Sequence, residues 1–279
     1  MTKKHDIIVV GAGLFGCIAA ALARAEGHRV TLIGLSRPYE ASPASGCVLA
    51  PSWLGSLEKT QVADAMAVLA SLYTLHPLEF RTNVGLKFKA QRVHTPDILT
   101  PPDIQGRVTA LTATGVRYTD LDGADHTLRG IVLVCTGVWG RELVPSMPAI
   151  RGLYGCSLRI PGQLAEPVIN AYAPYRQAVA FNMDKRSVWF GDGTALIAKT
   201  WDAEERARIL TTVERAKKVT ALSAPARLTH VIGARPYVEG HKAGYFERVT
   251  PRLYVSNGGA KNGTVLAAWQ AMNFVNSLP

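Results

Sequence analysis

The sequence predicts the α/β class, because an apolar strand, a glycine-rich turn and an alanine-rich helix follow one another at its beginning. Asp6–Val10 is a short apolar run typical of a strand buried on both faces. The turn Gly11-Ala12-Gly13-Leu14-Phe15-Gly16 follows directly, and a helix pattern from Cys17 to Glu26 ends at Gly27. A second apolar strand spans Arg29–Ile33. Strand, turn, helix and strand within about 30 residues are the layout of a Rossmann-type dinucleotide site.

Each glycine of this turn has a separate predicted task. Gly11 permits the tight turn, Gly13 lets the backbone approach a pyrophosphate, and Gly16 lets the helix pack closely on the strand. The phosphates are then expected at the N–H groups of the helix N-terminus, where the helix dipole favours negative charge.

The rest of the chain alternates helix and strand patterns. An amphipathic helix is expected over 57–75, with Val62, Met66, Leu69 and Leu72 on one face. Residues 107–119 and 127–135 are predicted as strands around the Asp122-Gly123 turn, and 178–199 as a hairpin that turns near Asp184-Lys185. A charged helix is expected over 203–219, then a strand over 252–256 and a closing helix. The proline-containing stretch 84–105 is expected to be irregular.

Composition excludes several classes of protein. The 279 residues, 48% hydrophobic and 19% charged, suit one large or two small globular domains. Four scattered cysteines, Cys17, Cys47, Cys135 and Cys156, predict neither a disulfide framework nor a zinc site, and no metal site is expected. No apolar run reaches the roughly 18 residues of a spanning helix, and no signal peptide is expected, so a cytoplasmic location is predicted.

The net charge of +10 is concentrated in the second half. Residues 1–150 carry 14 Lys/Arg against 12 Asp/Glu, whereas residues 151–279 carry 17 against 9. A polyanionic partner such as nucleic acid would explain this excess, and solubility is the alternative explanation.

Four segments together resemble the D-amino-acid oxidase / glycine oxidase family of FAD-dependent flavoproteins. They are the opening IIVVGAGLFG, the stretch from Ala41 to Pro51, the segment IVLVCTGVWGREL (131–143), and Ala234-Arg235-Pro236 with the loop from Leu253 to Gly263. They occur in the family's order along most of the chain. The resemblance implies a Rossmann-type FAD-binding domain interleaved with a shortened antiparallel-sheet substrate domain. Residues 1–55, 107–150 and 230–279 are expected to form the first, and residues 56–106 and 151–229 the second.

The chain departs from the family pattern in two places. The family usually has Glu at the end of the second strand, where it holds the adenosine ribose; this chain has Gly34, followed by Ser36 and Arg37. Arg37 alone would also fit the 2′-phosphate of NADP, but the other three segments favour FAD. The chain is also short for the family, which predicts a more open active site.

The resemblance carries over to individual residues of this sequence. Arg235 is expected to bind the substrate carboxylate as the catalytic arginine, and Lys261 either touches flavin or substrate or faces solvent. Trp139 is interpreted as a packing residue. The expected FAD contacts are Gly11, Ala12, Gly13, Leu14, Phe15, Gly16, Ser36, Arg37, Ser45, Gly46, Val108, Thr136, Gly137, Gly258, Gly259, Ala260, Asn262, Gly263 and Thr264.

The implied reaction is oxidation of an amine next to a carboxylate. A hydride leaves the α-carbon for the flavin, the imine is hydrolysed, and oxygen reoxidises the flavin. The flavin supplies the chemistry, so no protein nucleophile is needed, and a planar guanidinium suits the carboxylate.

Three functions remain open at this point. The favoured one oxidises a glycyl unit attached to a nucleic-acid base, DNA or tRNA, which leaves an aminomethyl base and glyoxylate after net C–N cleavage. This function resembles a family branch that acts on carboxymethylaminomethyl-uridine in tRNA, and phage enzymes that hypermodify DNA would need the same step, so a phage-encoded protein in a bacterial cell is compatible with it. The alternatives are an oxidase of free glycine, sarcosine or D-amino acids, and a non-catalytic flavin-binding protein. The favoured function predicts a basic rim around the substrate side of the flavin, to which Lys217, Lys218 and Lys242 would contribute.

Overall fold

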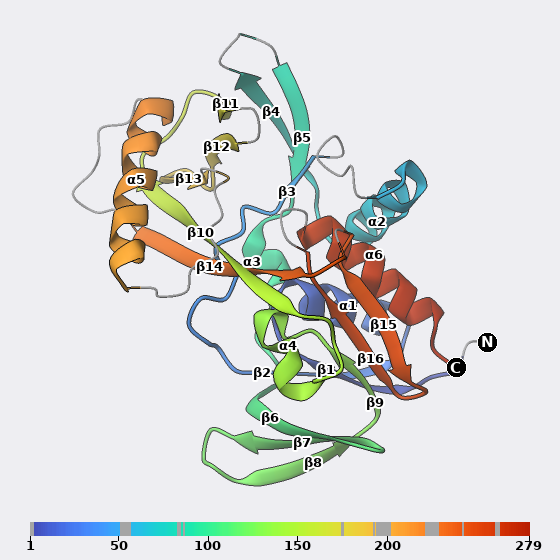
Figure 1. Ribbon diagram of the computed structural model, residues 1–279. Helices are drawn as coiled ribbons and strands as arrows, with labels where there is room; N and C mark the ends of the chain where they lie inside the picture. The colour runs from blue at the N-terminus through green and yellow to red at the C-terminus, as the bar shows by residue number, and fades with distance from the viewer. Residues whose placement is uncertain are drawn as a thin grey trace.

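The protein is built on two sheets that are packed side by side (Figure 1). The computed structural model describes residues 3–50, 57–82, 85, 87–173, 176–191, 193, 202–220, 229–241, 243–259 and 263–279. Within this part of the chain each sheet has eight strands. The mixture of a parallel sheet, covering helices and a second, largely antiparallel sheet confirms the predicted α/β class.

The first sheet has the strand order β15-β16-β9-β1-β2-β6-β7-β8. Its centre is parallel: β1 (Asp6–Val10) lies between β2 (Arg29–Gly34) and β9 (Ile131–Val134), and β16 (Leu253–Asn257) continues beyond β9. These strands are apolar runs because both of their faces are covered. The edge strand β15 (Tyr245–Thr250) pairs antiparallel with β16.

Helices cover one face of the first sheet, and a meander of strands continues its far edge (Figure 1). The helices are α1 (Leu14–Ala25), α2 (Lys59–Leu72) and α6 (Gly263–Asn276), so the predicted amphipathic helix over 57–75 is confirmed. The meander consists of β6 (Ile104–Thr112), β7 (Gly115–Asp120) and β8 (Asp125–Arg129). Val108, Val116 and Tyr118 of this meander pack with apolar side chains of β1 and β9.

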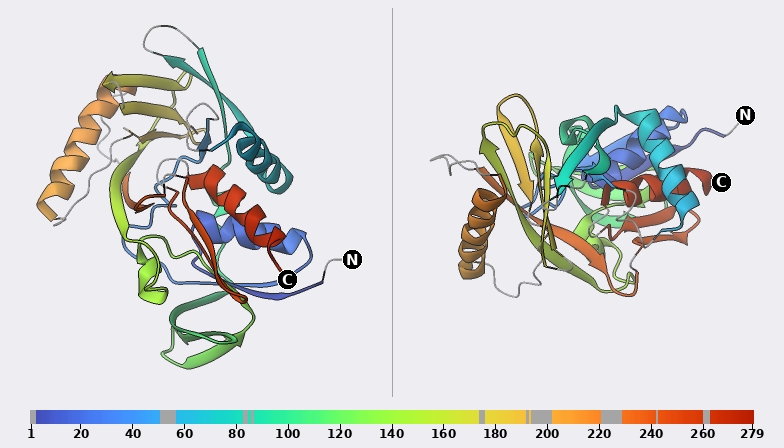
Figure 2. Two further views of the ribbon diagram at one scale, coloured as in Figure 1. Left: turned by 45° about the vertical axis from the view of Figure 1, so that its right-hand side comes forward. Right: turned by 90° about the horizontal axis from the view of Figure 1, so that it is seen from above.

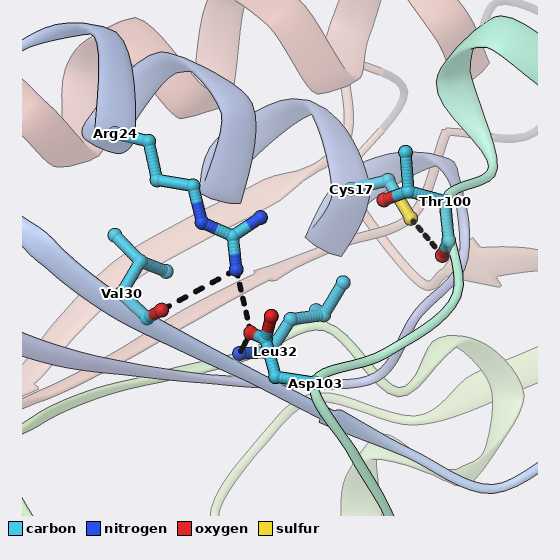
Figure 3. Close-up of polar contacts among 6 residues, drawn as sticks. All are labelled: Cys17, Arg24, Val30, Leu32, Thr100 and Asp103. Atoms are coloured by element: carbon cyan, nitrogen blue, oxygen red, sulfur yellow. Dashed lines mark hydrogen bonds and ion pairs between the residues drawn. The ribbon is translucent and has the colours of Figure 1, made fainter.

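Polar contacts tie α1 to the edge of β2 (Figure 3). Arg24, in the last turn of α1, donates to the Val30 carbonyl at 3.3 Å and forms an ion pair with Asp103 at 2.5 Å. The same carboxylate accepts the Leu32 N–H at 2.6 Å, directly before β2 begins to pair with β6. Asp103 therefore holds the helix and the strand in one arrangement.

The second sheet has the strand order β14-β10-β13-β12-β11-β4-β5-β3. The bounds are β3 (Val48–Leu49), β4 (His76–Thr82), β5 (Lys87–Arg92), β10 (Ile150–Pro161), β11 (Val168–Ala173), β12 (Arg176–Asn182), β13 (Ser187–Gly191) and β14 (Thr229–Val238). The β12–β13 hairpin confirms the predicted turn near Asp184-Lys185, and residues 192 and 194–199 of the predicted range lie outside the described residues. Short helical turns complete the fold: α3 (Thr95–Ile98), η2 (Gly137–Trp139) and α4 (Gly140–Leu143).

The charged helix α5 (Asp202–Thr220) covers the outer face of the second sheet. In both views of Figure 2 it lies on the side of this sheet away from α1 and α6. Ala178 and Ala180 of β12 belong to the apolar cluster beneath α5, whereas Val179 and Phe181 between them belong to the cluster on the opposite face. This alternation is the period of two of a strand and separates the two faces clearly.

Some predicted elements differ from the structure. The expected strand over 107–119 is the β6–β7 hairpin, which turns between Thr112 and Gly115. The expected strand over 127–135 is interrupted at Gly130, so β8 and β9 are separate strands. A Cβ atom at Gly130 would lie 2.8 Å from the Asp6 carbonyl oxygen, a close approach that glycine permits. The stretch 84–105, expected to be irregular, contains β5 and α3. The turn at Asp122-Gly123 could be predicted because glycine favours a turn, whereas the Thr112-Ala113-Thr114 stretch gave no comparable signal for the β6–β7 turn.

The sheets divide the chain differently from the predicted domains at several places. Strand β3 belongs to the second sheet, although 1–55 was assigned to the FAD-binding domain. Strand β14 belongs to the second sheet, although 230–279 was assigned to the FAD-binding domain, and α2 packs on α6 of the first sheet, although 56–106 was assigned to the substrate domain. The division into two functional domains stays a prediction.

Candidate functional site

A cavity of about 590 Å³ lies where the two sheets meet. Residues of the β1–α1 turn, the end of β2 and the 41–47 loop line it, together with residues of β10, β13 and β14. Its volume falls in the range of sites that bind small molecules and cofactors. Because the lining comes from both sheets, a ligand here would contact both.

The β1–α1 turn has the backbone geometry that its glycines predict. Gly11 has φ +107°, and a Cβ atom there would lie 2.5 Å from the Cys135 carbonyl oxygen, so only glycine fits. A Cβ atom at Gly16 would lie 1.8 Å from the Gly11 carbonyl oxygen. These two glycines therefore allow the helix to start immediately beside the strand.

The start of α1 faces the cavity and contacts a serine from the next loop. The Leu14 N–H donates to Ser42 Oγ at 2.9 Å, and a Cβ atom on Gly13 would lie 2.9 Å from the same oxygen. Gly13, Leu14 and Ser42 all line the cavity. The arrangement combines backbone N–H groups, a hydroxyl and a helix N-terminus, which together suit a phosphate group.

The 39–46 loop, which follows β2 along the chain, contacts both the start of α1 and the second sheet. Before Ser42 in the chain, the Tyr39 carbonyl accepts the Ala234 N–H at 2.8 Å, and the absence of a side chain at Gly233 lets Ala41 approach β14. Further along, Gly46 packs against Trp189, and a Cβ atom on this glycine would lie 3.2 Å from that ring. Residues of this loop therefore line the cavity from the N-terminus of α1 to the second sheet.

The described part of a second glycine loop, after β16, contacts the first. Gly258 has φ +85°, and the Asn257 side chain donates to the Gly137 carbonyl at 2.7 Å. A Cβ atom on Gly259 would lie 2.8 Å from the Phe15 ring, so the two glycine loops are in direct contact.

The end of β2 forms the opposite end of the cavity from the second sheet. Leu35, 41% exposed, lines it, and Arg37 forms an ion pair with Glu142 at 3.1 Å. The Arg37 guanidinium lies 5.1 Å from the centre of the Trp139 ring. Trp139, predicted to be a packing residue only, lines the cavity as well.

Strand β14 places Arg235 at the second-sheet end. The half-buried Arg235 lines the cavity and pairs across the strands with Leu153 of β10. Trp189 and Val179, from the cavity-facing side of the sheet, line the same end.

Burial raises the pKa of the Cys135 thiol, which lines the cavity too, so this cysteine is held in its neutral form and is a poor nucleophile.

Most of the predicted contacts line the cavity. They are Gly11, Ala12, Gly13, Leu14, Phe15, Arg37, Ser45, Gly46, Val108, Thr136, Gly137, Gly259, Gly263, Thr264 and Arg235. Gly16, Ser36 and Gly258 are not part of its lining. Gly16 instead allows the close approach of α1 to the turn at Gly11, and Gly258 adopts the positive φ of a turn. Ala260, Lys261 and Asn262 lie outside the described residues.

Several lining residues were not among the contacts predicted from the sequence, among them Ser42, Glu142, Trp189 and Asn257. Ser42 lies within the segment that carried the resemblance, so its position between two glycine loops was a usable signal. Glu142 likewise lies within the segment 131–143 that carried the resemblance, whereas Trp189 offered no signal, since only the fold brings its strand to the cavity.

The basic rim expected from Lys217 and Lys218 is wrong. Both residues lie on α5, on the face of the second sheet opposite Val179 and Trp189, and Lys217 donates to Glu214 at 2.7 Å. Lys242 lies outside the described residues.

Three side chains of metal-ligand type also lie together outside the cavity lining. His76, His94 and Asp97 place ligand atoms within 4.8 Å of one another. Arg92 Nη2 is 3.1 Å from His94 Nε2, and this permanent positive charge opposes the binding of a cation.

No protein-family model and no curated protein matches the sequence. The structure is similar to several solved structures over nearly its whole length. A glycine oxidase from Bacillus cereus ATCC 14579 superposes with a TM-score of 0.69 at 15% identity, over 99% of this chain and 95% of its own. An FAD-dependent oxidoreductase from Pseudomonas aeruginosa gives 0.67 at 17%, over 100% and 92%. An iminodiacetate oxidase from Chelativorans sp. BNC1 gives 0.64 at 14%, over 98% and 96%. These similarities confirm the predicted fold.

Among the described residues, no helix is both long and apolar enough to cross a membrane.

Proposed function

We propose that the protein is an FAD-dependent oxidoreductase that oxidises a glycine-type amine, with oxygen as electron acceptor. One observation carries the proposal: a single cavity joins the glycine turn at the start of α1 to Arg235 on the second sheet. A long cofactor with a pyrophosphate in its middle would span this distance and bring its redox-active ring to the arginine.

The described residues fit FAD. The α1 N-terminus, Gly13 and Ser42 offer a phosphate cradle. Within the part of the chain that the structure describes, the buried Thr136 hydroxyl beside the cavity has no hydrogen-bond partner, an arrangement that a polar ligand would relieve. NADP fits less well, because Glu142 already neutralises the Arg37 guanidinium that would bind a 2′-phosphate.

The proposed chemistry divides between cofactor and protein. Bound FAD would supply the hydride acceptor that turns the amine into an imine. Arg235 would bind the substrate carboxylate through a charge-assisted, bidentate pair and so orient the α-carbon. Trp189 and Val179 would exclude water from that end of the cavity. Similarity to a glycine oxidase and an iminodiacetate oxidase supports an amine next to a carboxylate as the reacting group.

The more specific form of the proposal attaches this glycyl amine to a nucleic-acid base, in the cytoplasm of a bacterial cell. Its support is the excess of 17 Lys/Arg over 9 Asp/Glu in residues 151–279, to which Lys217 and Lys218 contribute from a face away from the cavity. Free glycine, sarcosine or D-amino acids are the alternative substrates, and they need no such charge.

The test is to purify the protein, identify its chromophore, and add substrates without oxygen. We expect FAD in the released chromophore and loss of the yellow colour with a glycyl-modified nucleoside or oligonucleotide. A colourless protein that binds NADP would refute the cofactor. Bleaching by free glycine or sarcosine alone would refute the nucleic-acid form, and a flavin that no amine bleaches would support a non-catalytic role.

A further inference from the structure

The end of β2 lacks the acid that dinucleotide-binding folds usually place there for the adenosine ribose. This chain has Gly34, and a Cβ atom at that position would lie 2.9 Å from Ala12 Cβ and 3.0 Å from Ala12 N. A glutamate at position 34 would therefore collide with the glycine turn. The ribose hydroxyls need an acceptor from another part of the fold.

A carboxylate from α4 reaches the same end of the cavity. Strand β6 pairs with the end of β2 through Gly34 and Gln105, and Arg107, two residues further along β6, lies 4.0 Å from Glu142 Oε2. From the β2 side, Arg37 Nη1 donates to both Glu142 oxygens, at 3.1 and 3.2 Å. Glu142 is thus held between Arg37, in the segment after β2, and Arg107, on β6.

The two arginines fix the carboxylate and leave it able to accept more hydrogen bonds. An ionised carboxylate offers about four lone-pair positions, and Arg37 and Arg107 use only part of them. The Glu142 side chain remains 48% exposed and lines the cavity. Leu35 and Trp139, on the same stretch of lining, provide apolar surface for an adenine ring.

We infer that Glu142 accepts hydrogen bonds from the adenosine ribose of FAD and so replaces the acid missing at Gly34. This inference rests on the proposed function. It makes Glu142 a cofactor-binding residue, with Arg37 and Arg107 as the residues that position its carboxylate.

The experiment measures Kd by dialysing the holoprotein to equilibrium against FAD or against its analogue with 2′-deoxyadenosine. Wild type should bind the analogue more weakly than FAD. Glu142→Gln keeps the size of the side chain and removes its charge, so it should raise the Kd for FAD about tenfold and narrow the difference between FAD and the analogue. The matched control is Glu166→Gln, because Glu166 forms an ion pair with Arg81 at 2.9 Å, is 45% exposed, and is not part of the cavity lining. It should leave both constants unchanged.

The outcomes separate this inference from the proposed function. If Glu142→Gln binds FAD as wild type does, or weakens FAD and the analogue by the same factor, Glu142 does not contact the ribose and the inference is wrong, while the proposed function stands. If wild type binds neither FAD nor FMN, the proposed function fails and the inference fails with it.

Discussion

Replacing Gly13 by Ala would separate the stability of the α1 start from its binding of a phosphate. Gly13 has φ −83° and ψ −175°, an extended conformation that alanine adopts without strain. The new Cβ atom would lie 2.9 Å from Ser42 Oγ and 4.0 Å from Ser42 Cβ, and among the described residues beyond its chain neighbours no other atom would lie within 4 Å. The Ser42 hydroxyl must therefore move by about 0.5 Å or rotate away, since ordinary contacts begin near 3.4 Å.

The cost follows from the hydrogen bond that this movement breaks. The Leu14 N–H donates to Ser42 Oγ at 2.9 Å, and a typical bond of this kind contributes about 1 kcal/mol to the free energy of unfolding. For a protein of this size, Tm should fall by about 2 °C. The Kd for FAD should rise about tenfold, because the new methyl group would occupy the space that a pyrophosphate needs.

A double-mutant cycle with Ser42→Ala provides the assay. Thermal unfolding is measured for wild type, Gly13→Ala, Ser42→Ala and the double variant, together with FAD Kd by flavin fluorescence. In the Ser42→Ala background the hydrogen bond and the obstructing oxygen are both gone, so Gly13→Ala should change Tm no further. It should still weaken FAD by the same factor.

Two outcomes of this cycle, one in Tm and one in the Kd for FAD, would contradict the reasoning. If the two substitutions lower Tm independently, Ser42 does not mediate the effect of the new methyl group. If Ser42→Ala restores the FAD affinity of Gly13→Ala, the methyl group acts through the serine and no phosphate lies against Gly13.

The remaining predictions concern the fold, the substrate and the partner. Gly11→Ala should cost about 3 kcal/mol or more, because φ +107° is strained for alanine and its Cβ atom would meet the Cys135 carbonyl oxygen at 2.5 Å; a chemical denaturation midpoint equal to that of wild type would contradict this. Arg235→Ala should lower kcat/KM for the carboxylate substrate by about 30-fold or more while the flavin content stays constant, and equal kinetics would remove Arg235 from the site. Turnover of a glycyl-modified nucleic acid should fall steeply with salt, with a log–log slope of several units, whereas a flat profile would favour a free amino acid as substrate.

The nucleotide end of the site was predictable because its determinants are local. Gly11 needs a positive φ, and the β1–α1–β2 unit spans residues that follow one another along the chain. The same holds for the Asp122-Gly123 turn and the β12–β13 hairpin, where turn residues and alternation lie within one short window. The resemblance over four segments extended this to the second glycine loop and to Arg235.

Other features depended on elements that meet only in three dimensions. Glu142 lies more than 100 residues from Arg37, and nothing in the sequence near either residue predicts their ion pair. The excess positive charge was visible in the sequence, but its location was not: α5 packs on the outer face of the second sheet, so Lys217 and Lys218 lie away from the cavity.

The fold class, the glycine turn and part of the cavity lining followed from the sequence alone, since backbone conformation and apolar periodicity are properties of neighbouring residues. Only the tertiary structure decided which face of each strand lines the cavity and which charges surround it. A strand presents alternate side chains to opposite faces, and the packing of α5 over Ala178 and Ala180 is what turns Val179 toward the cavity. Long-range packing of this kind has no local signature, which is why only the fold places Glu142 and Trp189 at the cavity.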